Sequence, residues 1–235
     1  MNLARRATAE ALGTALLLLA IVGSGIMAER LCGGNVGLAL LVNAVATGGT
    51  LAALILALGP VSGAHFNPCV TLADAWQGGI PWTSVPPYVA AQIVGALCGT
   101  ALANGMFSLP LLFASHRVRS GGPLLVSEFC ATFGLLVVIW GCIRARPEST
   151  PFAVGAYIVG AYWFTPSTSF ANPAVTLARS LTDTFSGIRP ADAPLFILAQ
   201  LLGAFAATAV IAYLSPISRA AARAVVVAHA ERSHA

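Results

Sequence analysis

Two short motifs place the same polar residues at the same spacing in different halves of the chain. Residues 67–73 read NPCVTLA and residues 172–178 read NPAVTLA, so six of the seven positions are identical. An asparagine before a proline favours the start of a helix, because the asparagine side chain caps free backbone N–H groups and proline fits the first helical position. The side-chain amides of Asn67 and Asn172 can also donate hydrogen bonds to an oxygen atom of a neutral solute. The motifs therefore predict binding of a small polar molecule.

The motifs are not accompanied by the residues that catalysis needs. No nucleophile with an adjacent base, pair of carboxylates or group of metal ligands lies beside either motif. The five cysteines form no CxxC pair and are odd in number, which argues against a zinc site or a disulfide framework. We therefore expect no enzymatic activity, no catalytic residue, no metal and no cofactor.

The composition shows what kind of element must position the motifs. Of the 235 residues, 57% are hydrophobic and only 9% are charged, whereas soluble domains carry about 25% charged residues. Most of the surface therefore faces a lipid bilayer. The 12 basic residues are all arginines, scattered singly or in pairs, so the sequence gives no sign of nucleic-acid binding.

Charged residues and loop residues divide the chain into apolar stretches. The first stretch is 18 residues long, longer than the usual apolar core of a secretion signal, and we interpret it as a retained membrane span. Gly59-Pro60 is expected to end the second stretch. Two further segments, 67–76 and 172–181, are too short to cross a bilayer and begin at Asn-Pro. Six full spans are expected at 11–28, 36–58, 84–107, 124–143, 152–166 and 194–214.

The two halves of the chain form an internal repeat. Glu10 and Gln92 in residues 1–118 correspond to Glu128 and Gln200 in residues 119–214, in the same order relative to the Asn-Pro motifs. Each half has three full spans, an odd number, so the second half must enter the membrane from the opposite side. The predicted fold is an all-α membrane protein with six transmembrane helices and two re-entrant half-helices in an inverted repeat. Residues 215–235 are expected to form a cytoplasmic tail.

An inverted repeat brings the two Asn-Pro ends together near the middle of the membrane. Two helix N-termini that meet there repel cations and offer donors to neutral solutes. An active transporter would normally need a titratable or ion-binding cluster at this point, and the sequence shows none there. The predicted pore midplane consists of Asn67, Pro68, Cys69, Asn172, Pro173 and Ala174.

In these motifs and in their order along the chain, the sequence resembles the aquaporin, or major intrinsic protein, family over residues 10–214. The resemblance implies a homotetramer in the inner (plasma) membrane with both termini in the cytoplasm. It also implies that Glu10 and Glu128 accept hydrogen bonds from the loops that carry the half-helices, although a simple polar contact between spans is the alternative. His65 is placed either beside the cytoplasmic vestibule or as a structural cap of its loop.

The chain departs from the family at two places. Water-selective members have a filter arginine three residues after the second asparagine, and this sequence has Val175 there. Counting from the motifs places the other filter residues at Thr47, Gly160 and Ser169, which predicts a wide, uncharged filter. Cys69 replaces the usual alanine and is either a small packing residue or a pore-facing thiol open to mercurials.

Bacterial members associated with arsenic resistance resemble this chain in having the same valine. The expected function is a passive channel for glycerol-sized or neutral metalloid solutes, such as arsenite and methylarsenicals, and for water. The alternatives are a water or glycerol facilitator and, more remotely, an active transporter. Arg179 lies one helical turn beyond Val175. It is either a displaced cation guarding the outer vestibule, or an interfacial arginine reaching toward water or pairing with Asp183.

Overall fold

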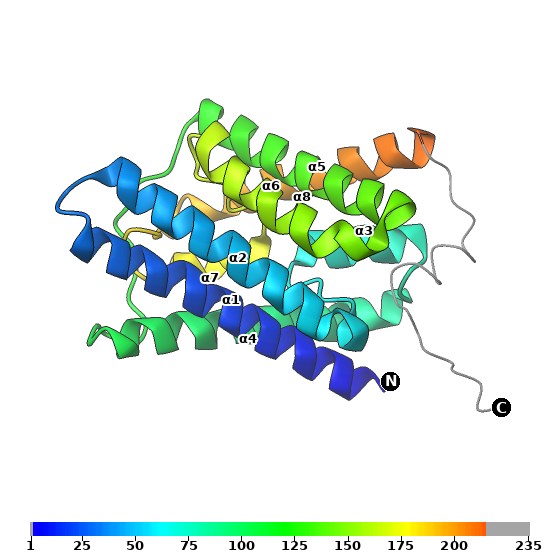
Figure 1. Cartoon of the computed structure of the whole chain (residues 1–235), viewed down its shortest axis with the longest axis horizontal. Helices are drawn as coiled ribbons and strands as arrows, with labels where there is room; N and C mark the ends of the chain where they lie inside the picture. The colour runs from blue at the N-terminus through cyan, green and yellow to red at the C-terminus, as the bar shows by residue number, and fades with distance from the viewer. Residues whose placement is uncertain (1, 215–235) are drawn as a thin grey trace.

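Helices make up all the regular secondary structure in residues 2–214, the part of the chain that the structure, a computed structural model, describes (Figure 1). The expected tail at 215–235 lies outside the described residues. The axes of the long helices lie roughly parallel to one another, and the short helices α3 and α7 lie toward opposite ends of the bundle. The helices are α1 (Leu3–Leu31), α2 (Val36–Ser62), α3 (Pro68–Gln77), α4 (Val85–Met106), α5 (Gly122–Ala145), α6 (Thr150–Phe164), α7 (Pro173–Arg179) and α8 (Ala193–Leu214).

Five of the expected spans are long and apolar enough to cross a membrane: α1, α2, α4 with the 3-10 turn before it, α5 and α8. The remaining span, α6, has 15 residues, or about 22 Å at 1.5 Å per residue. A 3-10 turn, Pro147–Ser149, precedes α6 and extends it at one end.

The end of α2 differs from the expectation that Gly59-Pro60 breaks the helix. The helix continues through Pro60 to Ser62 and ends at Gly63, whose φ of 89° is left-handed and whose N–H bonds to the carbonyl of Gly59. Pro60 has no N–H to complete an i to i−4 hydrogen bond, and the helix ends two residues after it.

The packing repeats between the two halves. Helix α1 packs against α4 and α2, and in the same way α5 packs against α8 and α6. The close approach of α1 and α4 depends on Gly95 and Gly99, because a Cβ atom at these positions would lie 2.2 Å from the carbonyl oxygen of Ala11 and 2.1 Å from that of Ala15. In the second half Gly203 approaches Phe129 of α5 in the same manner. Small residues thus bring the long helices together as expected in lipid.

Candidate functional site

The two asparagines of the repeated motifs join the half-helices crosswise. The Asn67 side-chain amide donates to the carbonyl of Ala171 at 2.7 Å, and the Asn172 amide donates to the carbonyl of Phe66 at the same distance. The Asn67 Oδ1 accepts from the backbone of its own half-helix, and so does the Asn172 Oδ1. Each amide has a second N–H, and both asparagines line the central cavity. Pro68 and Pro173 are the first residues of α3 and α7.

Two buried glutamates hold the loops that precede the half-helices. Glu10 accepts from the backbone N–H groups of His65 and Phe66 at 3.0 and 2.7 Å. Glu128 accepts from Phe170 and Ala171, both at 2.9 Å. These are the loop contacts that the resemblance implied. The glutamates do not line the cavity, and they bind the loop backbones outside the cavity wall.

The loops need such anchors because their backbones are strained. Phe66 and Ala171, each just before its asparagine, have φ angles of 48°, a left-handed region that non-glycine residues rarely adopt. The glutamines complete each anchor: the Gln92 amide donates to Glu10 at 2.8 Å, and the Gln200 amide donates to Glu128 at 2.6 Å.

Both asparagines line a cavity of about 470 Å³. Its wall combines apolar side chains, Leu17, Ile21 and Val70 among them, with polar ones. Such a wall suits a small molecule that carries both hydroxyl groups and carbon. The expected site residues that line the cavity are Thr47, His65, Asn67, Ser169, Asn172, Val175 and Arg179.

Gly160 does not line the cavity, and its assignment to the filter was wrong. It is exposed on the surface of α6, and a Cβ atom there would have no neighbour within 4 Å. Ile158 and Tyr162, four residues apart on one helix face, line the cavity instead. The Tyr162 hydroxyl lies 3.2 Å from the Thr47 hydroxyl. The filter region therefore contains an aromatic side chain that counting from the motif missed.

Arg179 brings a charged side chain to the cavity that the expected filter residues line. It lines the same cavity as Ser169 and Val175, yet it is only 1% exposed. Its guanidinium lies 3.5 Å from the centre of the Phe170 ring, and its Nε donates to the carbonyl of Ser186. It is neither an interfacial arginine reaching to water nor the partner of Asp183.

The carboxylate of Asp183 is instead bound to His116, on the loop between α4 and α5. The backbone N–H of His116 donates to it at 2.9 Å, and the His116 ring lies 3.0 Å from its second oxygen. These bonds lower the pKa of Asp183, chiefly through the backbone N–H. Asp183 therefore has its own partners.

A second guanidinium, which the sequence analysis did not assign to the site, approaches the same phenylalanine. Arg119, on the loop before α5, lies 5.2 Å from the centre of the Phe170 ring and donates to the carbonyls of Gly187 and Ser167 at 2.8 and 3.0 Å. Burial lowers the pKa of Arg119 to about 10, so the side chain is charged at neutral pH. No local sequence signal marks Arg119, because its partners lie on other loops.

Cys69 is a packing residue. Its side chain is fully buried in an apolar cluster with Ala44 and Val70, and it does not line the cavity. The alternative of a pore-facing thiol is therefore wrong. Ala174, the corresponding residue of the second motif, is likewise buried and away from the cavity.

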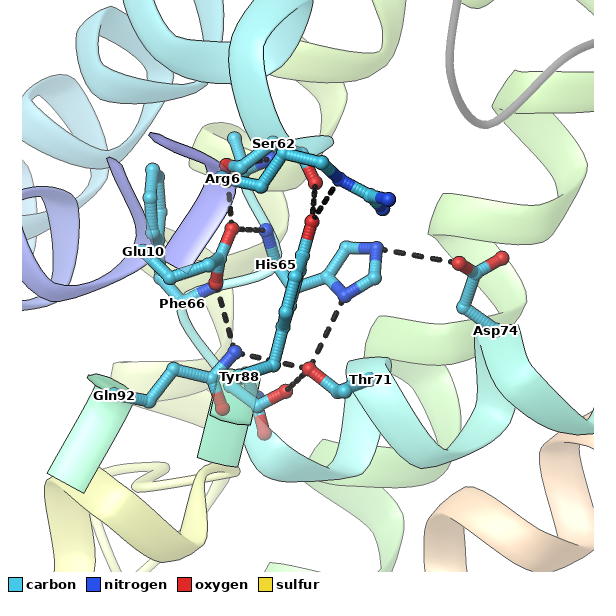
Figure 2. A network of polar contacts seen from close by, with 11 residues as sticks. Arg6, Glu10, Ser62, His65, Phe66, Thr71, Asp74, Tyr88 and Gln92 are labelled. Carbon is cyan, nitrogen blue, oxygen red and sulfur yellow. Dashed lines mark hydrogen bonds and ion pairs between the residues drawn. The ribbon is translucent and has the colours of Figure 1, made fainter. Parts of the chain in front are cut away.

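His65 lies in a buried polar network at the other end of the cavity (Figure 2). Its Nδ1 is 3.1 Å from the Thr71 hydroxyl and its Nε2 is 3.4 Å from a carboxylate oxygen of Asp74. The Tyr88 ring lies tilted beside the imidazole, with the ring centres 5.4 Å apart, and its hydroxyl accepts from the Nε of Arg6 at 2.7 Å. His65 lines the cavity and also ties its loop to α3, as the alternative of a structural cap of the loop predicted. Asp74 was not singled out from the sequence, although it stands just after the matched motif.

A helical membrane bundle in which two half-helices meet at a polar, cavity-lining junction defines a class of membrane channel. The profile described as Major intrinsic protein matches residues 1–165 and 148–234. The chain belongs to the major intrinsic protein family, whose aquaporin members are membrane channels and not enzymes.

Curated relatives and a solved structure agree with this family. The chain is 54% identical over 213 residues to Aquaglyceroporin AqpS of Rhizobium meliloti, covering 91% of each protein. It is 29% identical over 243 residues to Probable aquaporin AqpM of Archaeoglobus fulgidus, covering 92% of this chain and 98% of that protein. The X-ray structure of the aquaglyceroporin from Plasmodium falciparum matches with a TM-score of 0.65 at 20% identity, covering 94% and 99% of the two chains. The similarity to this solved structure shows that the chain shares its fold.

Proposed function

We propose that the chain is a passive channel for small uncharged solutes that carry hydroxyl groups, passing glycerol-sized molecules and neutral metalloid species such as undissociated arsenous acid and methylarsenicals, together with water. The observation that carries the proposal is the replacement of the family's filter arginine by Val175 in a cavity whose wall is partly apolar and partly polar. A methylated or carbon-bearing solute can lay its apolar side on this wall while the asparagine amides bind its oxygen atoms.

The named relative supports the proposal that the chain passes water and glycerol-sized solutes. AqpS of Rhizobium meliloti is described as an aquaglyceroporin, and more than half of the aligned residues are shared with this chain. The proposal of metalloid transport rests on Val175 in place of the family's filter arginine. A channel used mainly for water or glycerol is the alternative within the same class.

We also propose a homotetramer in the inner membrane, with both termini cytoplasmic. Large apolar side chains lie exposed along the outside of the bundle, among them Leu12, Val94 and Phe205. Lipid or neighbouring subunits would cover them. The mass of the protein in detergent, measured by light scattering, tests the tetramer.

The experiment for the function is solute flux in proteoliposomes containing the purified chain. We expect glycerol flux to be linear in the glycerol gradient and indifferent to proton and sodium gradients. Glycerol uptake driven by an ion gradient would contradict a passive channel. Liposomes with a Val175→Trp variant, which fills the cavity near Ser169, provide the matched control and should show only background flux.

A further inference from the structure

We propose that His65 and Asp74 together bind one proton in the cavity wall, and that loss of this proton reduces solute flux. The inference builds on the proposed channel function. Both side chains are almost fully buried, at 2% and 1% exposure, and both line the cavity. Within residues 2–214, neither the His65 Nε2 nor either Asp74 oxygen forms a hydrogen bond. The two groups face each other at 3.4 Å (Figure 2).

The contacts of Thr71 support an assignment of the ring nitrogen of His65 that carries a hydrogen. The Thr71 hydroxyl donates its single hydrogen to the carbonyl of Asn67 at 3.1 Å and accepts from the Gln92 amide at 2.9 Å. Thr176, the counterpart in the second repeat, donates to the carbonyl of Asn172 at 2.8 Å in the same way. By analogy with Thr176 we assign the Thr71 hydrogen to the Asn67 carbonyl, so that the His65 Nδ1, 3.1 Å from the Thr71 oxygen, is the donor and carries a hydrogen.

This assignment leaves the Nε2 of a neutral His65 with a lone pair that faces the carboxylate of Asp74. A lone pair and a buried carboxylate repel each other, whereas a proton between them makes a charge-assisted hydrogen bond. Asp74 also lies near the C-terminal end of α3, where a negative charge is unfavourable. The Nε2 of His65 and the carboxylate of Asp74 can form a hydrogen bond when one proton lies between them. The pair then holds one proton more than a neutral histidine and an ionised aspartate would hold.

The neighbouring charged groups do not replace this proton. Glu10 on α1 accepts from Ser62, Gln92 and the loop backbone. Arg6 on α1 donates to Tyr88 of α4. Arg144 of α5 donates to Gln77 of α3. Glu148, in the turn before α6, lines the cavity, and an ionised carboxylate can accept hydrogen bonds but cannot donate one.

The wall behind Asp74 sets the direction of the effect. A Cβ atom at Gly79 would lie 2.0 Å from the Asp74 Oδ1, so the backbone of Gly79 closes one side of the carboxylate. When the proton leaves to water in the cavity, the unpaired carboxylate must be hydrated, and the open direction is into the cavity. The turned side chain and its water narrow the pathway, so flux falls as the pH rises.

The test is glycerol flux in proteoliposomes of the full chain, measured at pH values of roughly 5 to 9, a range that brackets the ordinary histidine pKa of about 6.5. We expect wild-type flux to fall severalfold toward the alkaline end. Asp74→Asn should make flux independent of pH, because the new amide N–H donates to the neutral Nε2. His116→Gln is the matched control, since it removes a second His–Asp pair that lies exposed on a loop, and should retain the wild-type pH dependence.

A flat wild-type profile, or an Asp74→Asn variant that titrates like wild type, would overturn the proposal. Nitrogen-15 NMR of labelled histidine gives a readout that needs no flux: one of the four histidines should keep its second proton to a higher pH than the other three and lose it over the pH range in which flux falls, and Asp74→Asn should remove that signal. If glycerol does not pass at any pH while this signal is present, the proposed function fails and the proton site stands. If the signal is missing, the proton site fails.

Discussion

Asp74 and Arg179 occupy the same place in the two repeats, seven residues after Asn67 and Asn172 (74 − 67 = 179 − 172 = 7), and carry opposite charges. Both are buried and line one cavity. Each is paired with the residue two positions before its asparagine, Asp74 with His65 and Arg179 with Phe170. The two half-helices thus bring different chemistry to the two ends of an otherwise matched pathway.

We expect Arg179→Leu to raise proton and cation leakage while neutral solute flux is kept. A unit charge at ~4 Å contributes about 1 kcal/mol in water and about 4 kcal/mol near protein, so the leak should rise roughly fivefold or more. Proton flux into pH-dye-loaded liposomes measures it. Arg117→Leu removes an exposed arginine paired with Glu29 and should change nothing. Equal leakage in both variants would count against a role for Arg179 in the cavity.

Val175→Arg should restore the family's usual filter residue and narrow the pathway. Val175 is buried in the wall beside Ser169 and Arg179, so a second guanidinium there takes up space and adds charge. Flux of glycerol and methylarsenite should fall far more than that of water in stopped-flow measurements. Equal loss of all three fluxes would mean that the position does not select by size.

Tyr162→Ala should widen the cavity, because it removes a ring that lines the cavity beside Thr47. We expect flux of solutes larger than glycerol, such as four-carbon polyols, to rise relative to glycerol. Gly160→Ala is the matched control on the same helix, where a Cβ atom meets nothing within 4 Å. A change of the solute range in Gly160→Ala and none in Tyr162→Ala would restore the assignment that the structure corrected.

Glu128→Gln should destabilise the fold through the second loop. The carboxylate accepts three hydrogen bonds, from Phe170, Ala171 and Gln200, and the new amide turns a donor toward at least one of these donors. A loss of about 3 kcal/mol in the free energy of unfolding is expected from bonds to a buried charge. Thermal unfolding in detergent measures it. Glu29→Gln, on the surface, should shift the midpoint little.

Much of the fold could be predicted because hydropathy and the repeat fix it. Long uncharged stretches have few alternatives to spanning helices, and Asn-Pro marks the start of both half-helices. The end of α2 was harder to predict, because a proline usually ends or kinks a helix, yet α2 continues for two residues beyond Pro60. Sequence alone does not show how close Pro60 lies to that end.

Site residues could be predicted where a fixed number of residues separates them from an Asn-Pro motif. They were harder to predict where the contact partner lies on another helix or loop. Thr47, Ser169 and Val175 line the cavity as counted from the motifs. Gly160 does not, because which face of α6 turns inward depends on how that helix packs. The surroundings of Arg179 depend on Phe170 and on the carbonyl of Ser186, which no spacing rule relates to it.

The central claim is that a cavity without the family's filter arginine passes neutral solutes larger than water. The most direct measurement is a parallel flux panel for water, glycerol, urea, arsenite and methylarsenite in the same proteoliposomes. We predict that glycerol and both arsenicals cross far faster than in protein-free liposomes, with methylation causing little loss of flux. Water flux with background rates for glycerol and both arsenicals would contradict the account.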